Sequence, residues 1–279
     1  MEEHIPTRNA AIIERKFILK FNNETELTNW VLGASNLWLF LDYDGTLVDF
    51  ASSPDEIKPN PKVAHVLAQL AGQSQMRVAI ISGRKLHDIR LLLPVTGIFL
   101  AGTYGIEILT ASGKEINRVD YDDVRPTLES LKPQWERIIV GRKGFFLEDK
   151  GWTLALHARF ADDSDAEEVL AAAQSTIDQQ KLTELFRILS GHKFLEIAPI
   201  LANKKEAVDY LLHQFPFPEA KCVYIGDDDK DEEAFSAIHA QYGVAIKVLQ
   251  PSQHSLLTDA DYFLESPNGA IRWLEHLIR

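Results

Sequence analysis

Carboxylate side chains are concentrated at two points of the chain, each directly after an apolar run. Asp42 and Asp44 follow residues 37–41, and three consecutive aspartates at 227–229 follow residues 222–225. Asp42 and Asp44 are two residues apart, so in an extended chain their side chains point the same way. Like charges held together repel, and a divalent cation relieves the repulsion. The pattern predicts Mg²⁺, which prefers oxygen ligands.

A third polar loop, Ser82-Gly83-Arg84, follows the apolar run at 77–81. Ligands of open α/β sheets bind beyond the carboxyl ends of the strands, so the three loops share one crevice if their strands are neighbours. Taken alone, Ser82 is most simply a helix cap and Lys204 a solvated helix residue. The argument for chemistry therefore rests on the ordered set and not on either residue.

Strand-like and helical patterns alternate in the first hundred residues and again after about residue 195. We expect strands at 37–41, 77–81, 98–101 and 222–225, and helices at 61–70 and 204–212. Strands that alternate with helices indicate a parallel sheet covered on both faces. The predicted fold class is α/β, a doubly wound, Rossmann-like parallel sheet with an inserted α+β cap domain.

The predicted domain organisation has three parts. Residues 1–34 form an N-terminal helical extension, with Thr25 as the N-cap of a helix over 26–32 that ends at Gly33. Residues 35–107 and 195–279 form the core domain. Residues 108–194 form the cap domain, with a hairpin turn at Ser112-Gly113, a strand at 152–157 and a helix at 165–179.

The composition is that of a globular protein of 279 residues with a net charge of −12. Such a charge does not attract nucleic acid or an anionic membrane, and it repels an anionic substrate unless a cation and local basic residues reverse the field. No segment is long and apolar enough to span a bilayer, and the N-terminus is polar, so we expect a cytoplasmic protein. Cys222, the single cysteine, excludes an internal disulfide and lies in an apolar run that predicts burial. The oligomeric state is left open.

The ordered set resembles the motifs of haloacid dehalogenase-type phosphatases. Residues 41–47 (LDYDGTL) resemble the first motif and Ser82-Gly83-Arg84 the second. Lys204 resembles the third motif, and residues 226–232 (GDDDKDE) resemble the fourth. The resemblance extends from about Leu37 to the C-terminus.

The resemblance implies a mechanism. Asp42 attacks phosphorus and forms an aspartyl-phosphate, and Asp44 is the general acid and then the general base. The phosphate oxygens are held by three residues, Ser82, Gly83 and Lys204. Mg²⁺ is held by Asp42, by the backbone carbonyl of Asp44 and by Asp227, and is supported by Asp228 and Asp231.

Within that family, the insert resembles the trehalose-6-phosphate phosphatase group, through residues 102–107, 148–159 and 195–199. This likeness implies a sugar phosphate substrate, most simply trehalose 6-phosphate, as the small-molecule partner. The implied substrate contacts are Arg84, Tyr104, Glu148, Lys150, His157 and Arg159.

The chain departs from the group's pattern at four positions. Tyr104 replaces His, Ala158 replaces Tyr, Ala198 replaces a basic residue and Lys205 replaces Gly. The phosphoryl chemistry keeps all its residues. Three alternatives stay open: a phosphatase for another glycosyl phosphate, such as glucosylglycerol phosphate or a glycosyl-3-phosphoglycerate, a mutase of the same superfamily, and a non-catalytic sugar-phosphate sensor.

Overall fold

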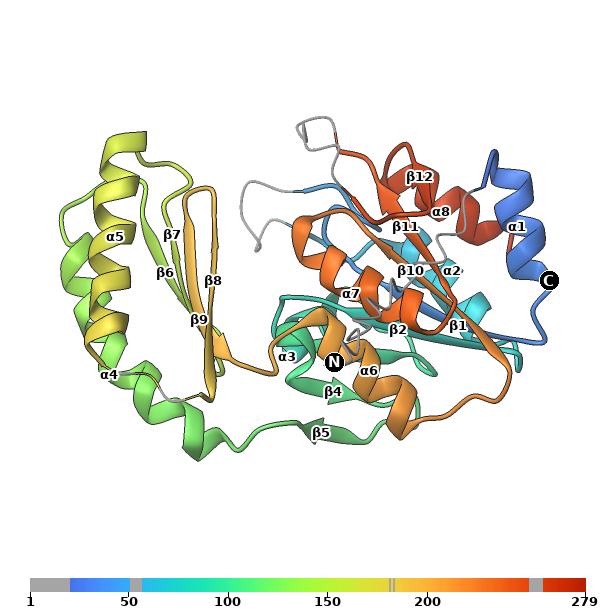
Figure 1. Ribbon diagram of the computed structural model, residues 1–279, viewed down its shortest axis with the longest axis horizontal. Coiled ribbons are helices and arrows are strands. Elements are labelled where there is room, and N and C mark those ends of the chain that lie inside the picture. The colour runs from blue at the N-terminus through green and yellow to red at the C-terminus, as the bar shows by residue number, and fades with distance from the viewer. Residues whose placement is uncertain (1–20, 51–56, 181, 183, 251–257) are drawn as a thin grey trace, which may run out of the picture.

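The strands of the protein form two separate sheets, as Figure 1 shows. The computed structural model describes residues 21–50, 57–180, 182, 184–250 and 258–279. The large sheet contains β1 (Asn36–Leu41), β2 (Met76–Ile81), β3 (Phe99–Gly102), β4 (Glu107–Leu109), β5 (Glu115–Asn117), β10 (Ala220–Gly226), β11 (Val244–Val248) and β12 (Tyr262–Leu264). The small sheet contains β6 (Phe146–Asp149), β7 (Leu154–His157), β8 (Phe186–Gly191) and β9 (Phe194–Pro199).

The large sheet is parallel at its centre. Its order is β12-β11-β10-β1-β2-β3-β4-β5, and β1 pairs in parallel with both β10 and β2. Among the described strands of this sheet, only β4 and β5 take part in antiparallel pairing. The predicted fold class is confirmed by this arrangement.

Helices cover both faces of the large sheet because residues of its central strands alternate between two apolar clusters. Leu37, Leu39 and Leu41 of β1 face one cluster, and Trp38 and Phe40 face the other. The first cluster contains residues of α1 (Glu24–Leu32), α2 (Pro61–Ala71), α3 (Leu86–Leu92) and α8 (Pro267–Glu275). The second contains residues of α6 (Lys204–Gln214) and α7 (Asp229–Ala240).

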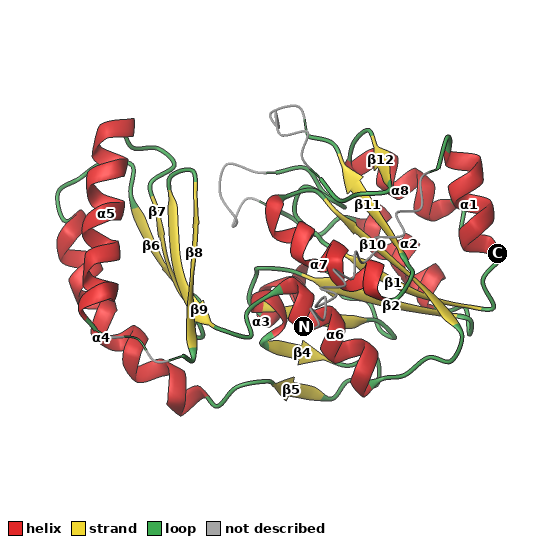
Figure 2. Ribbon diagram, in the orientation of Figure 1, coloured by secondary structure: helices red, strands yellow, loops and turns green. Residues whose placement is uncertain are grey.

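The small sheet is antiparallel, in the order β6-β7-β9-β8. Two helices, α4 (Tyr121–Ile139) and α5 (Asp163–Gln179), pack against it through a cluster that includes Leu128, Trp135 and Val169. Figure 2 shows these helices on the side of the small sheet away from the large one. The uncovered side therefore faces the carboxyl ends of β1 and β2.

The expected limits of the insert need correction at both ends. A hairpin with its turn at Ser112-Gly113 joins β4 to β5, and β4 pairs with β3, so residues up to Asn117 belong to the large sheet and not to a cap that begins at 108. At the other end, β9 pairs with β7 and β8, so residues 195–199 belong to the small sheet. At both ends of the insert, the backbone hydrogen bonds between strands determine to which sheet the residues belong.

The N-terminal helix begins earlier than predicted. Asn23, and not Thr25, is the N-cap of α1, and its side chain accepts from the N–H of Glu26; the helix ends at Gly33 as expected. Leu27 packs into the first apolar cluster, so α1 is part of the core. Residues 1–20 of the predicted extension lie outside the described residues. None of the helices within the described ranges combines the length and the apolar character that crossing a bilayer requires.

Candidate active site

The polar loops identified in the sequence lie at the ends of neighbouring strands. Asp42 follows β1, Ser82 follows β2 and Asp227 follows β10, and β1 lies between the other two. The three strands are therefore neighbours, as the prediction of one shared crevice required. The turn after Asp42 requires glycine at position 45, because its φ is +85° and a Cβ would collide with the carboxylate of Asp227.

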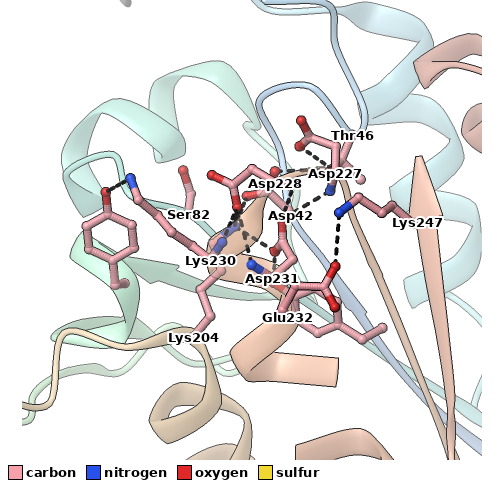
Figure 3. Close-up of polar contacts among 12 residues, drawn as sticks. Asp42, Thr46, Ser82, Lys204, Asp227, Asp228, Lys230, Asp231, Glu232 and Lys247 are labelled. Carbon is pink, nitrogen blue, oxygen red and sulfur yellow. Dashed lines mark hydrogen bonds and ion pairs between the residues drawn. The ribbon is translucent and has the colours of Figure 1, made fainter. Parts of the chain in front are cut away.

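Lys204 lies between two buried carboxylates (Figure 3). Its Nζ donates to Asp42 Oδ1 at 2.8 Å and to Asp231 Oδ1 at 2.7 Å. Burial by itself lowers the pKa of a lysine, but Asp231 and Asp42 outweigh it and hold the pKa of Lys204 well above its ordinary value. The ammonium is therefore charged at neutral pH, as a phosphate-binding cation has to be.

Asp42 is held on both oxygens. Besides Lys204 on Oδ1, the Thr46 hydroxyl lies 3.1 Å from Oδ2 and the same distance from Asp227 Oδ1, and its one proton serves one of them at a time. Burial raises the pKa of Asp42, and Lys204 opposes that rise. A nucleophilic carboxylate has to be ionised, so the site needs more positive charge than Lys204 alone provides.

Asp227 provides the observation that fits a metal ion. Its Oδ2 is buried and has no hydrogen-bond partner among the described residues. Burial and then the charge of Asp42 raise the pKa of Asp227 to about 9. Carboxylate oxygens of Asp42, Asp227 and Asp231 lie within 4.8 Å of one another. A divalent cation at this point would give the orphaned oxygen a partner and offset the repulsion.

Asp231 and Asp228 have structural partners that the sequence did not reveal. Asp231 accepts from the Tyr224 hydroxyl at 2.6 Å, from Lys204, and from the backbone N–H groups of Asp227 and Asp228. Asp228 is the N-cap of α7 in a capping box with Asp231. Asp228 is not among the carboxylates that lie within 4.8 Å of one another, and its Oδ1 lies 4.0 Å from Nζ of Lys204, so its support of a metal, directly or through water, stays a prediction. Asp231, through the backbone of Asp227, orients the acidic loop.

Asp44 and Arg84 form a two-pronged ion pair. Nε and Nη2 of Arg84 each donate to one oxygen of Asp44, both at 2.7 Å. Asp44, the predicted general acid, is therefore ion-paired with Arg84, a predicted substrate contact. Ser82 Oγ accepts from the N–H of Arg84, which fixes the loop that carries both Gly83 and Arg84.

A cavity of about 520 Å³ lies between the two sheets above these residues. It brings together the predicted site residues, except for Ser82, Asp227 and Asp231, which are buried. The predicted residues that line it are Asp42, Asp44, Gly83, Arg84, Tyr104, Glu148, Lys150, His157, Arg159, Lys204 and Asp228.

A buried carboxylate that the sequence did not single out, Glu196 of β9, joins the two sheets. It accepts from Lys150 at 3.0 Å, from Thr153 at 2.5 Å and from the hydroxyl of Tyr104 at 3.2 Å. Tyr104 comes from the large sheet's side and has a left-handed φ of 55°. The sequence marks Glu196 as a charge inside an apolar run, within the segment 195–199 that carries part of the resemblance, but gives it no role. Lys150 and Tyr104 thus line the cavity and also bind Glu196, where the two sheets are joined.

Glu148 and His157 face each other across the β6–β7 pair. Glu148 Oε2 lies 2.9 Å from His157 Nε2, and the imidazole stacks on Phe146 at 4.2 Å between ring centres. Burial raises the pKa of Glu148, but the hydrogen bond to His157 and the charge of Lys150 bring it below its ordinary value. The charged carboxylate of Glu148 can accept hydrogen bonds from the hydroxyl groups of a sugar, and the imidazole of His157 is held in a fixed position beside it.

Lys230 lines the cavity, and its place in residues 226–232 of the sequence predicts no particular role for it. Its Nζ donates to the Tyr104 hydroxyl at 3.1 Å and lies over the rings of Tyr104 and Phe194. Burial lowers the pKa of Lys230, partly offset by the charge of Asp228. The residue lies in the first turn of α7, one position before Asp231.

The fold and the site are those of the haloacid dehalogenase-type phosphatases, the class that the order of the motifs predicted: a Rossmann-like sheet with carboxylates at adjoining strand ends and a buried ammonium at the start of a helix. The family model described as trehalose-phosphatase matches residues 40–268. The chain belongs to the trehalose-phosphatase family.

Individual relatives agree with the family model. A probable trehalose-phosphate phosphatase of Sinorhizobium fredii is 30% identical over 236 residues, which cover 81% of this chain and 80% of the relative. Trehalose-phosphate phosphatase of Mycobacterium marinum is 30% identical over 233 residues, 82% of this chain but 58% of the longer relative. The C-terminal domain of Candida albicans trehalose-6-phosphate phosphatase superposes with a TM-score of 0.77 at 20% identity, covering 94% of this chain and 98% of that one.

Proposed function

We propose that this protein is a Mg²⁺-dependent phosphatase that hydrolyses trehalose 6-phosphate to trehalose and phosphate. The observation that carries the phosphatase proposal is the buried group of Asp42 and Asp227, at the ends of the adjoining strands β1 and β10, and Lys204, at the start of α6, whose ammonium donates to Asp42. The family match and the names of the relatives support the choice of substrate.

The residues of the large sheet have distinct roles in the proposed reaction. Asp42 attacks phosphorus as the leaving oxygen departs, and water then attacks the aspartyl-phosphate, releasing phosphate and restoring the carboxylate. Lys204, already 2.8 Å from Asp42, and the Ser82-Gly83 loop hold the phosphate oxygens. Asp44 gives a proton to the leaving oxygen and later takes one from water. Both transfers require that Arg84 release one of the two carboxylate oxygens of Asp44.

A divalent cation fits beside the orphaned Oδ2 of Asp227 and the carboxylate of Asp42. When bound, it supplies positive charge that offsets the charge of the transferring phosphoryl group. We propose Mg²⁺ because these ligands are carboxylate oxygens.

The residues facing the cavity from the small sheet are proposed to select the sugar. Glu148 and Lys150 provide an acceptor and a donor, and His157 and Arg159 lie further along the same cavity. The aromatic rings of Phe146 and Phe194 line the same space and suit the apolar face of a sugar ring.

The test is phosphate release from a panel of glycosyl phosphates, with Mg²⁺ and with a chelator. We expect release to be fastest from trehalose 6-phosphate, to require the cation, and to fall about a thousandfold or more in Asp42→Asn. Asp123→Asn, at an exposed aspartate of α4, is the matched control. Fastest release from another glycosyl phosphate would reject the substrate and keep the mechanism; no release from any would reject the enzyme.

A further inference from the structure

One of the lysines in the cavity lacks an ionic partner. Three lysines line the cavity: Lys150, Lys204 and Lys230. Lys150 pairs with Glu196 and Lys204 with Asp42, but Lys230 makes no ion pair with any carboxylate in the described part of the chain. Among the described residues, the one hydrogen-bond partner of its ammonium group is the neutral hydroxyl of Tyr104. Asp228 and Glu196 offset its charge only from beyond ion-pair distance, so the ammonium of Lys230 remains available to a ligand anion.

The location of Lys230 is unfavourable for a cation without a ligand. It lies in the first turn of α7, where the helix dipole favours negative charge. It is partly buried, and burial of an unpaired ammonium costs free energy. An anion that enters the cavity would remove both penalties.

Two aromatic rings fix where the ammonium of Lys230 lies. Its Nζ is 5.2 Å from the ring centre of Tyr104 and 4.8 Å from that of Phe194. Tyr104 packs so closely on the loop after β2 that a Cβ at Gly83 would come within 2.8 Å of its ring. Phe194 comes from the small sheet. The ammonium therefore lies beside the phosphate-binding loop, at the place where the two sheets meet.

We propose that Lys230 binds an anionic oxygen of the substrate, as a second lysine beside Lys204. This inference rests on the proposed function, since it names a further contact of the same site. The contact of Tyr104 with Gly83 points to the phosphoryl group as the source of that oxygen. An additional acidic group on the glycosyl part, such as a carboxylate, is the other source with the same chemistry.

The test compares three variants in the intact chain. Lys230→Met removes the charge and keeps much of the side-chain length, Lys230→Arg keeps the charge, and Lys62→Met is the control at an exposed lysine of α2. A hydrogen bond to a charged group predicts that KM for the sugar phosphate rises about ten- to a hundredfold in Lys230→Met. Lys230→Arg recovers most of that loss, and Lys62→Met matches the wild type.

Binding of inorganic phosphate, measured by calorimetry in Mg²⁺, identifies the source of the oxygen. If orthophosphate affinity falls by the same factor as KM rises, Lys230 binds the phosphoryl group. If orthophosphate affinity is unchanged but KM rises for substrates with an additional carboxylate, Lys230 binds that second acidic group. If KM and orthophosphate affinity both stay within twofold of the wild type, or if only the melting temperature falls, the inference is wrong.

The two proposals fail in different ways. If the wild type releases no phosphate from any sugar but Lys230→Met weakens orthophosphate binding, the inference on Lys230 stands and the proposed function falls. If the wild type is active and Lys230→Met binds substrate and orthophosphate normally, only the inference on Lys230 falls.

Discussion

At the scale of single residues, the acidic loop after β10 places buried carboxyl groups where the metal-free protein has too little positive charge for all of them to ionise. Asp227 is buried with one oxygen unpartnered, and its neighbours Asp42 and Asp231 are also carboxylates. Such an arrangement costs free energy in the folded state until a cation binds. Asp227 therefore links metal binding to stability.

Asp227→Asn tests that link. With a chelator present, we expect the variant to melt at a higher temperature than the wild type, because at neutral pH the buried carboxyl of Asp227 has to take up a proton on folding and the amide does not. With Mg²⁺ at a hundred times its Kd, the wild type gains about 2.7 kcal/mol and the variant gains little. Thermal unfolding with and without Mg²⁺ measures both effects, with Asp178→Asn on the surface of α5 as control.

The same residue predicts a pH dependence. The pKa of Asp227 in the fold, about 9, lies above the ordinary value of an aspartate, about 4. The folded metal-free protein therefore holds this proton more tightly than the unfolded chain, and stability falls as the pH rises through that window. Asp227→Asn should show a smaller fall. An equal response to Mg²⁺ and to pH in both proteins would contradict the assignment.

The sequence predicted which side chains come together around Asp42, because most of them lie in short motifs that directly follow strands. It did not predict Glu196, Thr153 or the role of Lys230, since each depends on contacts between segments far apart in the chain. The capping role of Asp228 was also missed, because three consecutive aspartates look alike until the start of α7 is known.

At the scale of elements, an ion pair fastens α4 to the end of β6. Arg125 donates to both oxygens of Asp149 at 2.8 and 2.9 Å, and Lys132 adds a third contact at 3.0 Å. The hydrogen bonds from Arg125 hold the pKa of Asp149 well below its usual range. This pair holds a helix with two internal prolines, Pro126 and Pro133, against its sheet.

Arg125→Met tests the pair. A depressed pKa stabilises the fold above the ordinary aspartate pKa of about 4, and this stability is lost as the pH falls below that value. We expect the variant to lose roughly 1 kcal/mol at pH 7, allowing for solvent screening, and the difference from the wild type to shrink towards pH 2. Urea unfolding at several pH values measures it. The same pH dependence in Arg142→Met, an exposed pair with Glu168, would argue against a specific role of Asp149.

The sequence predicted the central elements well because their apolar periodicity is strong. The expected strands and helices around β1, α2, β2, α6 and β10 agree with the structure to within two residues at either end. The extent of α4 was hidden by its prolines, which ordinarily interrupt a helix. The limits of the insert were misplaced because the hairpin of β4 and β5 joins the large sheet through pairing that short, partly polar strands do not reveal.

At the scale of the whole molecule, polar contacts join the small sheet to the rest of the protein. Tyr104 bonds to Glu196 of β9, and Arg187 of β8 bonds to Glu233 of α7 at 2.9 Å. These contacts hold the small sheet over the site. Movement of the small sheet is therefore expected to involve Tyr104.

Tyr104→Phe keeps the ring and removes the hydroxyl that reaches Glu196. We expect the variant without ligand to have a larger radius of gyration than the wild type, and the two proteins to converge when Mg²⁺ and a phosphate analogue are bound. Small-angle scattering measures this, with Tyr121→Phe, whose ring packs edge-on against Trp152, as control. Identical scattering of wild type and Tyr104→Phe in both states would exclude such a role for the hydroxyl.

Cys222 offers a practical consequence for studying that movement. It is the single cysteine, it is buried in β10, and burial raises the pKa of its thiol to about 11. Thiol reagents act on exposed thiolates, so the natural chain should be almost inert to maleimide dyes at neutral pH. A pair of cysteines introduced on the surfaces of α5 and α2 could then carry a donor and an acceptor fluorophore without background labelling, and opening could be followed in single molecules.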